Sequence, residues 1–315
     1  MTATTDPGSG AASTDPSSGA ATARPSSGAA TARPSSGTSP AGGSGAGSDR
    51  SIAVAFEKAR AEGRALLVGC MPAGFPTVGG SIAAMRAMVD AGVDVIEVEI
   101  PYSDPVMDGP VIQRASDIAL AGGVRTADTL RVIEAVASTG APVVTMTYWS
   151  PIERYGVDAF ARDLAAAGGT GLITPDLIPE EAGEWLAASD AHGLDRTFLV
   201  APSSTDRRLA LTLAHCRGFV YATALMGVTG AREKTSDAAP TLVGRVRAVS
   251  GLPVGVGLGV STGAQAAEVG RYADGVIVGS ALVRCLLDAP DEAAGLAALA
   301  TLSSELAGGV RAISP

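Results

Sequence analysis

The sequence has few of the residues on which metal and redox sites depend. Its 315 residues include three cysteines and two histidines: Cys70, Cys216, Cys285, His192 and His215. The cysteines lie far apart, with no CxxC or Cys/His spacing typical of zinc, so we expect reduced, mostly buried thiols. Chemistry that depends on a histidine base or a histidine-rich metal site therefore has few candidates.

Positive charge and long apolar runs are also scarce. The chain carries 23 Lys and Arg against 32 Asp and Glu, a formal net charge of −9. A nucleic-acid-binding protein needs a basic face, and this sequence supplies none. We see no stretch near the ~18 uncharged apolar residues of a membrane span and no secretory signal. We therefore expect a cytoplasmic protein with neither nucleic acid nor membrane as a partner.

The first 50 residues differ in composition from the rest. A nonapeptide at Ser17–Pro25 is repeated identically at Ser26–Pro34, after a degenerate copy at Gly8–Pro16. After its first position the tract holds no large apolar residue, so it cannot offset the entropy of ordering. We expect a disordered tail over 1–50 and a folded domain over 51–315, the tail being either a dispensable extension or a docking tether.

From residue 51 onward, short apolar runs alternate with Ala-rich stretches of helical period. The expected strands are Ala65–Cys70, Asp94–Glu99, Pro142–Met146, Gly171–Thr174, Thr197–Val200, Gly218–Tyr221, Pro253–Val256 and Gly275–Val278. The expected helices include Ser51–Glu62, Val78–Ala91, Val157–Ala167, Pro179–His192, Pro240–Ser250 and Thr262–Gly270. Near-continuous apolar strands alternating with helices indicate a parallel sheet covered on both faces. Eight such units in about 260 residues predict an α/β fold, a single TIM (β/α)8 barrel with extra helices.

The second strand carries an acidic residue within its apolar run. Alternation places Val95, Glu97 and Glu99 on one face and Ile96 and Val98 on the other. If the first face points into the barrel, Glu97 is a buried acid whose pKa is raised toward the range useful for proton transfer. The alternative is that Glu97 faces the helices and pairs with a basic residue.

A loop rich in Pro, Asp and Gly follows this strand, before a gap with room for two helices. Its Asp108 is followed by Gly109 and Pro110, which set a turn and predict a carboxylate exposed at the barrel mouth. One buried and one loop-borne carboxylate suit acid/base work. Alternatively, Asp104 and Asp108 only form turns.

Glycines cluster after the last three strands. They lie in Gly227–Gly230, Gly255–Ser261 and Gly279–Ser280. Loops after strands seven and eight, next to a helix amino terminus, commonly form the phosphate site of these barrels. The alternative is that these glycines serve tight turns only.

Several segments together resemble the tryptophan synthase alpha subunit family. They are Ile100–Gln113, Tyr148–Pro151, Leu172–Leu177, Gly227–Gly230 and Val278–Ala281. The resemblance implies a TIM-barrel lyase that cleaves indole-3-glycerol phosphate to indole and glyceraldehyde 3-phosphate in tryptophan biosynthesis. It also implies an α2β2 assembly in which the Pro101–Asp108 loop meets a beta subunit, indole passes to that subunit, and pyridoxal phosphate is bound there, with no cofactor in this chain.

The resemblance also implies roles for individual residues. Glu97 matches the catalytic glutamate and Asp108 the catalytic aspartate, while Tyr221 lines the site and Thr229 belongs to a loop that closes over the substrate. The residues that match the phosphate cradle are Gly230, Gly257, Gly259, Gly279 and Ser280. In this interpretation Glu97 donates a proton to indole C3 and then accepts one from the glycerol hydroxyl, while Asp108 holds the indole N–H.

A Schiff-base mechanism is disfavoured by the residues themselves. Lys58 and Lys234 are the only lysines in the chain, and neither falls on an expected strand. No metal is required for the proton transfers described above.

Three residues depart from the family pattern. Glu99 stands where the family commonly has Gly, Cys70 where an aromatic residue contacts indole, and Ser150 where Asn is frequent. A second acid near Glu97 is expected to raise its pKa further, unless Glu99 turns toward solvent or a partner. Two alternative functions stay open: a stand-alone lyase that releases free indole, and a non-catalytic regulatory subunit that binds a phosphorylated ligand.

Overall fold

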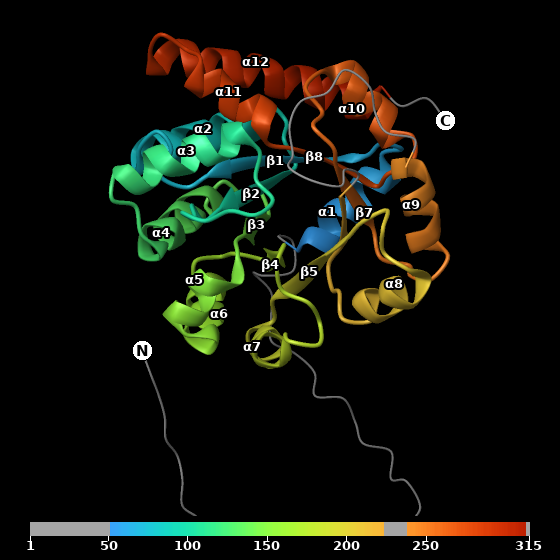
Figure 1. The fold of residues 1–315 in the computed structure, drawn as a ribbon. Helices are drawn as coiled ribbons and strands as arrows, with labels where there is room; N and C mark the ends of the chain where they lie inside the picture. Colours follow the sequence, from blue (N-terminus) through green and yellow to red (C-terminus); the bar gives the residue numbers. More distant parts are fainter. Residues whose placement is uncertain (1–50, 224–237, 313–315) are drawn as a thin grey trace, which may run out of the picture. The chain divides into compact units, whose positions relative to one another are not determined.

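The computed structural model describes residues 51–223 and 238–312 (Figure 1). The tail over 1–50, together with Thr229 and Gly230, lies outside the described residues. The expectations for those residues therefore stay predictions.

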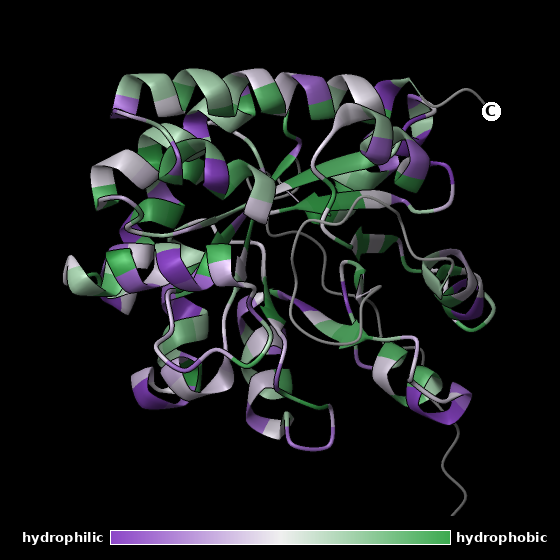
Figure 2. Cartoon of the chain, turned by 45° about the horizontal axis from the view of Figure 1, so that its top comes forward, coloured by the Kyte–Doolittle hydropathy of each residue, from purple (hydrophilic) through white to green (hydrophobic). Residues whose placement is uncertain are grey.

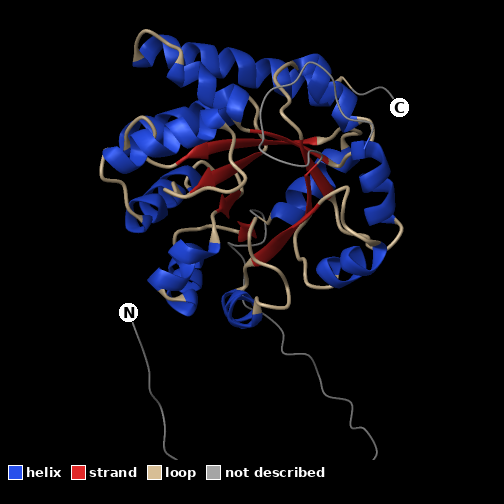
Figure 3. Ribbon diagram, in the orientation of Figure 1, coloured by secondary structure: helices blue, strands red, loops and turns tan. Residues whose placement is uncertain are grey.

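Eight parallel strands close into a barrel in sequence order, and β8 pairs with β1 (Figure 3). The strands are β1 (Leu66–Pro72), β2 (Val95–Glu99), β3 (Val143–Met146), β4 (Gly171–Thr174), β5 (Asp195–Val200), β6 (Val220–Thr223), β7 (Val254–Gly257) and β8 (Gly275–Val278). The predicted TIM barrel is confirmed. β1 ends two residues later than expected, because Pro72 pairs with Glu99. β6 both begins and ends two residues later than expected, and its last residue, Thr223, pairs with Gly257.

Helices surround the strands and follow the predicted alternation. They are α1 (Ile52–Ala61), α2 (Val78–Asp90), α3 (Pro110–Ala121), α4 (Thr126–Ala137), α5 (Trp149–Tyr155), α6 (Val157–Ala166), α7 (Gly183–His192), α8 (Asp206–Leu213), α9 (Ala238–Arg247), α10 (Gly263–Gly270), α11 (Ser280–Leu287) and α12 (Glu292–Arg311). The wide gap after β2 holds α3 and α4, as expected. α7 begins later than predicted because the backbone N–H groups of Glu181 and Ala182 close turns on Ile178 and Pro179.

Two apolar clusters fill the barrel and its outer layer. The inner cluster contains Val68, Val95 and Ile277 from the strands together with Ile52 and Phe56 from α1. The ring centroids of Phe56 and Phe219 lie 5.7 Å apart. Because Phe219 directly precedes β6, α1 packs at the amino-terminal end of the barrel. The opposite end, where the strands finish, is left for the functional site.

The last helix is both long and apolar, and it still carries Glu305 within its span. Among the described helices, α12 alone is long and apolar enough to cross a membrane by length and composition. Its buried residues include Leu299, Leu306 and Val310, and the helix contacts α2, α10 and α11. Figure 2 shows hydrophobic strands in the middle and helices of mixed hydropathy around them. The apolar side of α12 therefore packs against the other helices of the outer layer.

Candidate active site

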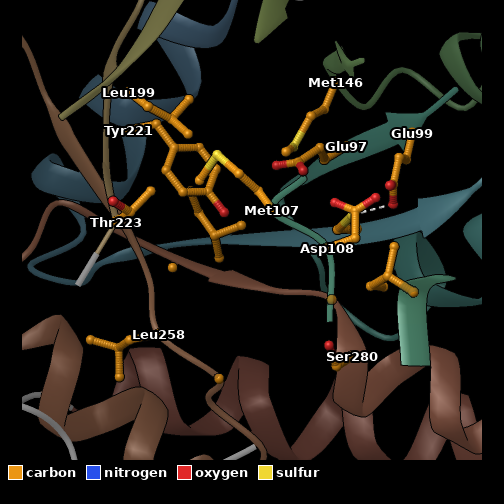
Figure 4. Close-up of a pocket in the computed structure, with 16 residues that line it drawn as sticks. Glu97, Glu99, Met107, Asp108, Met146, Leu199, Tyr221, Thr223, Leu258 and Ser280 are labelled. Atoms are coloured by element: carbon orange, nitrogen blue, oxygen red, sulfur yellow. Dashed lines mark hydrogen bonds between the residues drawn. The ribbon is translucent and has the colours of Figure 1, made fainter. Parts of the chain in front are cut away.

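A pocket of about 700 Å³, open solvent included, lies at the carboxyl ends of the strands. Figure 4 shows Glu97 and Glu99 on one side of it and Leu258 and Ser280 on the other. It is lined by Cys70, Glu97, Glu99, Met107, Asp108, Ile112, Met146, Leu199, Tyr221, Thr223, Gly257, Leu258, Gly259, Ile277, Gly279 and Ser280. The acidic strand and the glycine-rich loops predicted from the sequence thus share one chamber.

Glu97 points into the barrel. Its neighbour two residues back, Val95, belongs to the inner cluster, and Glu97 itself is 1% exposed. Its Oε2 atom has no hydrogen-bond partner within the described part of the chain. Burial raises the pKa of Glu97 to about 7, and the charge of Asp108 adds to the rise. The alternative that Glu97 faces the helices and pairs with a basic residue is wrong, because strand alternation turns it toward the cavity.

Asp108 is held by Tyr148, the N-cap residue of α5, and by Gln113 of α3. The Tyr148 hydroxyl donates to its Oδ1 across 3.0 Å, and the Gln113 amide donates to its backbone carbonyl across 2.8 Å. The expectation of an exposed carboxylate is wrong: these contacts hold Asp108 in the pocket, with 6% of its surface exposed. Burial raises the pKa of Asp108, while the hydrogen bond from Tyr148 opposes the rise. Asp104, in contrast, is exposed and accepts a hydrogen bond from Ser103, as a turn residue does.

Glu99 also lies in the pocket and is 5% exposed. The Cys70 thiol approaches its carboxylate, with 3.9 Å between Sγ and Oε2. Burial and the charges of Asp108 and Glu97 raise the pKa of Glu99 well above its ordinary value. The alternative that Glu99 turns to solvent is therefore wrong. The raised pKa of Glu97 comes from its burial and from Asp108, and Glu99 is not among its causes.

The glycine-rich side of the pocket is built from the ends of β7 and β8. Gly259 adopts a φ of 77°, a left-handed conformation that favours glycine. Gly279 is the N-cap of α11 and Ser280 its first residue, so the positive end of the helix dipole faces the chamber. These residues could hold an anion through backbone N–H groups.

Tyr221 depends on a glycine of the neighbouring strand. A Cβ atom at Gly257 would lie 2.5 Å from the Tyr221 hydroxyl oxygen. Gly257 therefore leaves the space in which the Tyr221 ring lies. Burial raises the pKa of Tyr221, so its hydroxyl stays protonated at neutral pH.

Sequence reasoning missed most of the apolar wall and one polar residue beside it, Thr223. The missed apolar residues are Met107, Ile112, Met146, Leu199, Leu258 and Ile277. It also did not predict the contact between Tyr148 and Asp108, although Tyr148 lies two residues beyond the carboxyl end of β3, the strand next to β2. That adjacency was the available signal, because neighbouring parallel strands end at the same rim.

The acidic groups of the pocket are not arranged as a metal site. Within residues 51–223 and 238–312, no group of three or more His, Cys, Asp or Glu side chains could hold a metal ion. Lys58 lies on α1, away from the pocket lining. The chamber instead offers buried acids, an apolar wall and a helix amino terminus.

These features define a TIM-barrel enzyme built for acid/base chemistry on a small anionic substrate. The model of the tryptophan synthase alpha chain family matches residues 56–311. The chain belongs to the tryptophan synthase alpha chain family, whose reaction is the lyase cleavage of indole-3-glycerol phosphate.

Curated relatives and solved structures agree with this assignment. A tryptophan synthase alpha chain of Salinispora arenicola is 83% identical over 260 residues, covering 82% of this chain and 97% of that protein. One from Acidothermus cellulolyticus is 63% identical over 261 residues, covering 83% and 97%. A structure of Mycobacterium tuberculosis tryptophan synthase superposes with a TM-score of 0.79 at 62% identity, covering 82% of this chain and 98% of that one. A tryptophan synthase alpha chain structure from Legionella pneumophila gives a TM-score of 0.75 at 34% identity, covering 82% and 96%.

Proposed function

We propose that this pocket cleaves indole-3-glycerol phosphate to indole and glyceraldehyde 3-phosphate, with Glu97 and Asp108 as its proton-handling groups. One observation carries the proposal. The buried Glu97, whose Oε2 has no partner among the described residues, lines the same chamber as the helix amino terminus at Ser280. A substrate with an aromatic ring at one end and a phosphate at the other fits between them.

The phosphate end of the substrate lies against the glycine-rich side in this proposal. Backbone N–H groups near Gly259, Gly279 and Ser280 donate to the phosphate oxygens, and the α11 dipole adds a favourable field. Glycine allows the backbone to approach the anion closely. This local attraction explains how a chain with a net charge of −9 binds a phosphate. Gly230 and Thr229 are proposed to complete this end, although they lie outside the described residues.

The indole end lies among the apolar side chains of the pocket, including Leu199 and Met146. Asp108 accepts a hydrogen bond from the indole N–H and stabilises positive charge on the ring when C3 is protonated. The Tyr148 hydroxyl fixes the direction of that carboxylate.

The reaction then needs two proton transfers by Glu97. Its carboxylic acid donates a proton to indole C3, and the resulting carboxylate accepts the proton of the adjacent glycerol hydroxyl. The bond between C3 and the hydroxyl-bearing carbon breaks, its electron pair returns to the ring, and that carbon becomes the aldehyde. Glu97 is left protonated as at the start, so all atoms and electrons balance. A pKa near 7 suits a group that both donates and accepts.

A beta subunit is the proposed partner that receives indole, and pyridoxal phosphate would be bound there. The loop over Pro101–Asp108 is proposed to contact that subunit. In support, Val106 in this loop is 71% exposed, and Pro101 and Tyr102 line a neighbouring groove with Ser150 and Arg154.

The test measures indole release by the full chain, alone and with a beta subunit. Glu97→Gln and Asp108→Asn are each expected to lower turnover by roughly 100-fold or more, while glycerol 3-phosphate still binds. Glu57→Gln, at an exposed position of α1, is the matched control. Normal turnover in Glu97→Gln overturns the proposed role. Absence of turnover in the wild-type chain under both conditions favours the regulatory alternative, and full activity without any beta-subunit binding favours the stand-alone lyase.

A further inference from the structure

Glu99 is a buried acid to which the proposed reaction assigns no task. It is the last residue of β2, two positions after Glu97, so both side chains leave the strand on the same face. In the barrel it pairs with Pro72 of β1 and Met146 of β3. Figure 4 shows its carboxyl group beside that of Asp108.

Among the residues that the structure describes, the groups around Glu99 bring no positive charge to it. β1 contributes the Cys70 thiol, β2 contributes Glu97, and the following loop contributes Asp108. Two tyrosine hydroxyls are also close enough for the charge of Glu99 to raise their pKa: Tyr148, before α5, and Tyr221, on β6. No Lys or Arg is among the residues that line the pocket. Three carboxyl groups share this cavity, and the negative charge of one opposes the ionisation of its neighbours.

The hydrogen-bond partners decide where the proton lies. Asp108 accepts an O–H donor from Tyr148, which favours its ionised form. Among the described residues, the donor that reaches Glu99 is the Cys70 thiol, a weak donor at 3.9 Å. The proton is therefore more stable on Glu99, where it can form a hydrogen bond to the ionised carboxylate of Asp108. The pKa directions agree, since the interaction between the two raises the pKa of Glu99 and lowers that of Asp108.

We infer that Glu99 is a positioning residue whose protonated carboxyl group donates a hydrogen bond to Asp108 and keeps it ionised toward the indole N–H. The pair then carries one negative charge and one proton, and it titrates as a unit. This inference rests on the proposed function for its catalytic consequence, although the sharing of the proton is a property of the chain alone.

Two variants of similar size separate hydrogen bonding from space filling. Glu99→Gln keeps an N–H donor to Asp108, whereas Glu99→Met fills the space without a donor. The readout is the acidic limb of kcat/KM against pH, where activity falls as Asp108 becomes protonated. In Glu99→Met the limb is expected to move up by about one pH unit, a tenfold gain in proton affinity of Asp108. In Glu99→Gln it stays at the wild-type position. If the acidic limb lies at the same pH in Glu99→Gln and Glu99→Met, whether both shift or neither does, the inference is overturned.

A second measurement needs neither turnover nor the Met variant. The full chain is labelled with 13C at the glutamate carboxyls and titrated by NMR, with Glu97→Gln and Glu99→Gln used to assign the two signals. Glu99 is expected to keep its proton at neutral pH, and Asp108→Asn is expected to lower its pKa. A Glu99 that is ionised at neutral pH overturns the inference. If the NMR result holds while Asp108→Asn retains full turnover, the shared proton stands and the proposed role of Asp108 fails.

Discussion

The Tyr148 hydroxyl lies 3.0 Å from Oδ1 of Asp108 and also accepts the backbone N–H of Met107 at 3.0 Å. The tyrosine thereby ties the loop after β2 to the segment between β3 and α5 at the mouth of the barrel. Its ring also stacks on Tyr102, with ring centroids 5.1 Å apart. Both contacts limit the freedom of the carboxylate proposed to hold the indole N–H.

The substitution Tyr148→Phe tests this contact. Removing a hydrogen bond to a charged group costs about 1.5–3 kcal/mol, so kcat/KM for indole release is expected to fall roughly tenfold or more at neutral pH. Tyr155→Phe is the matched control, because its hydroxyl bonds to Asp163 at 2.7 Å and does not line the pocket. Equal activity of the two variants would show that Asp108 needs no help from Tyr148.

The buried Glu97 makes the stability of the fold depend on pH. Its pKa is raised from 4.5 to about 7, so its contribution to stability is fully present below about pH 4.5 and is lost as the pH rises through about 7. Glu97→Gln removes this dependence. The difference in free energy of unfolding between Glu97→Gln and wild type is expected to shift in favour of the variant by on the order of 3 kcal/mol from about pH 5 to pH 8. Urea unfolding at both pH values measures the change, and a constant difference between the proteins would contradict it.

A methyl group at Gly257 tests the space left for Tyr221. Ala at this position would place its Cβ atom 2.5 Å from the tyrosine hydroxyl, so the ring must move within a barrel that has little room. Gly257→Ala is expected to lower kcat/KM at least about tenfold, mostly through KM. The control is Gly244→Ala on α9, where an added Cβ meets nothing within 4 Å. Unchanged KM in Gly257→Ala would mean that the ring position does not limit substrate binding.

α10 and α12 cross closely because two glycines, Gly263 and Gly309, leave room at the contact. A Cβ atom at Gly309 would overlap the backbone carbonyl of Gly263, which cannot move aside as a side chain can. Gly309→Ala is expected to lower the free energy of unfolding by about 1–3 kcal/mol. Its neighbour Gly308 has nothing within 4 Å of an added Cβ, so Gly308→Ala is expected to raise stability by up to about 1 kcal/mol. Urea denaturation midpoints compare the two variants, and equal effects would contradict the close helix crossing.

Much of the fold follows from local patterns in the chain. The apolar runs and their alternation with helices predict the barrel, because each strand must be covered on both faces. β4 and β8 begin and end where the sequence places them, at Gly171–Thr174 and Gly275–Val278. The alternation along β2 also predicts that Glu97 and Val95 share a face, as they do.

The burial of Asp108 could not be read from the chain, because its partner Tyr148 is 40 residues away. Turn residues around an aspartate indicate a loop, but they do not show what packs over it. The position of Glu99 was open for the same reason, since a strand end can turn toward the cavity or toward solvent.

The sequence by itself determined the barrel, the set of residues that share a face of β2, and the glycines at the ends of β7 and β8, because strand alternation and chain order are local properties. Only the tertiary structure decided that Glu97, Glu99 and Asp108 share one buried chamber, whose lining within residues 51–223 and 238–312 contains no Lys or Arg. The protonation of these acids depends on distances and burial across several strands, and those quantities exist only when the barrel closes.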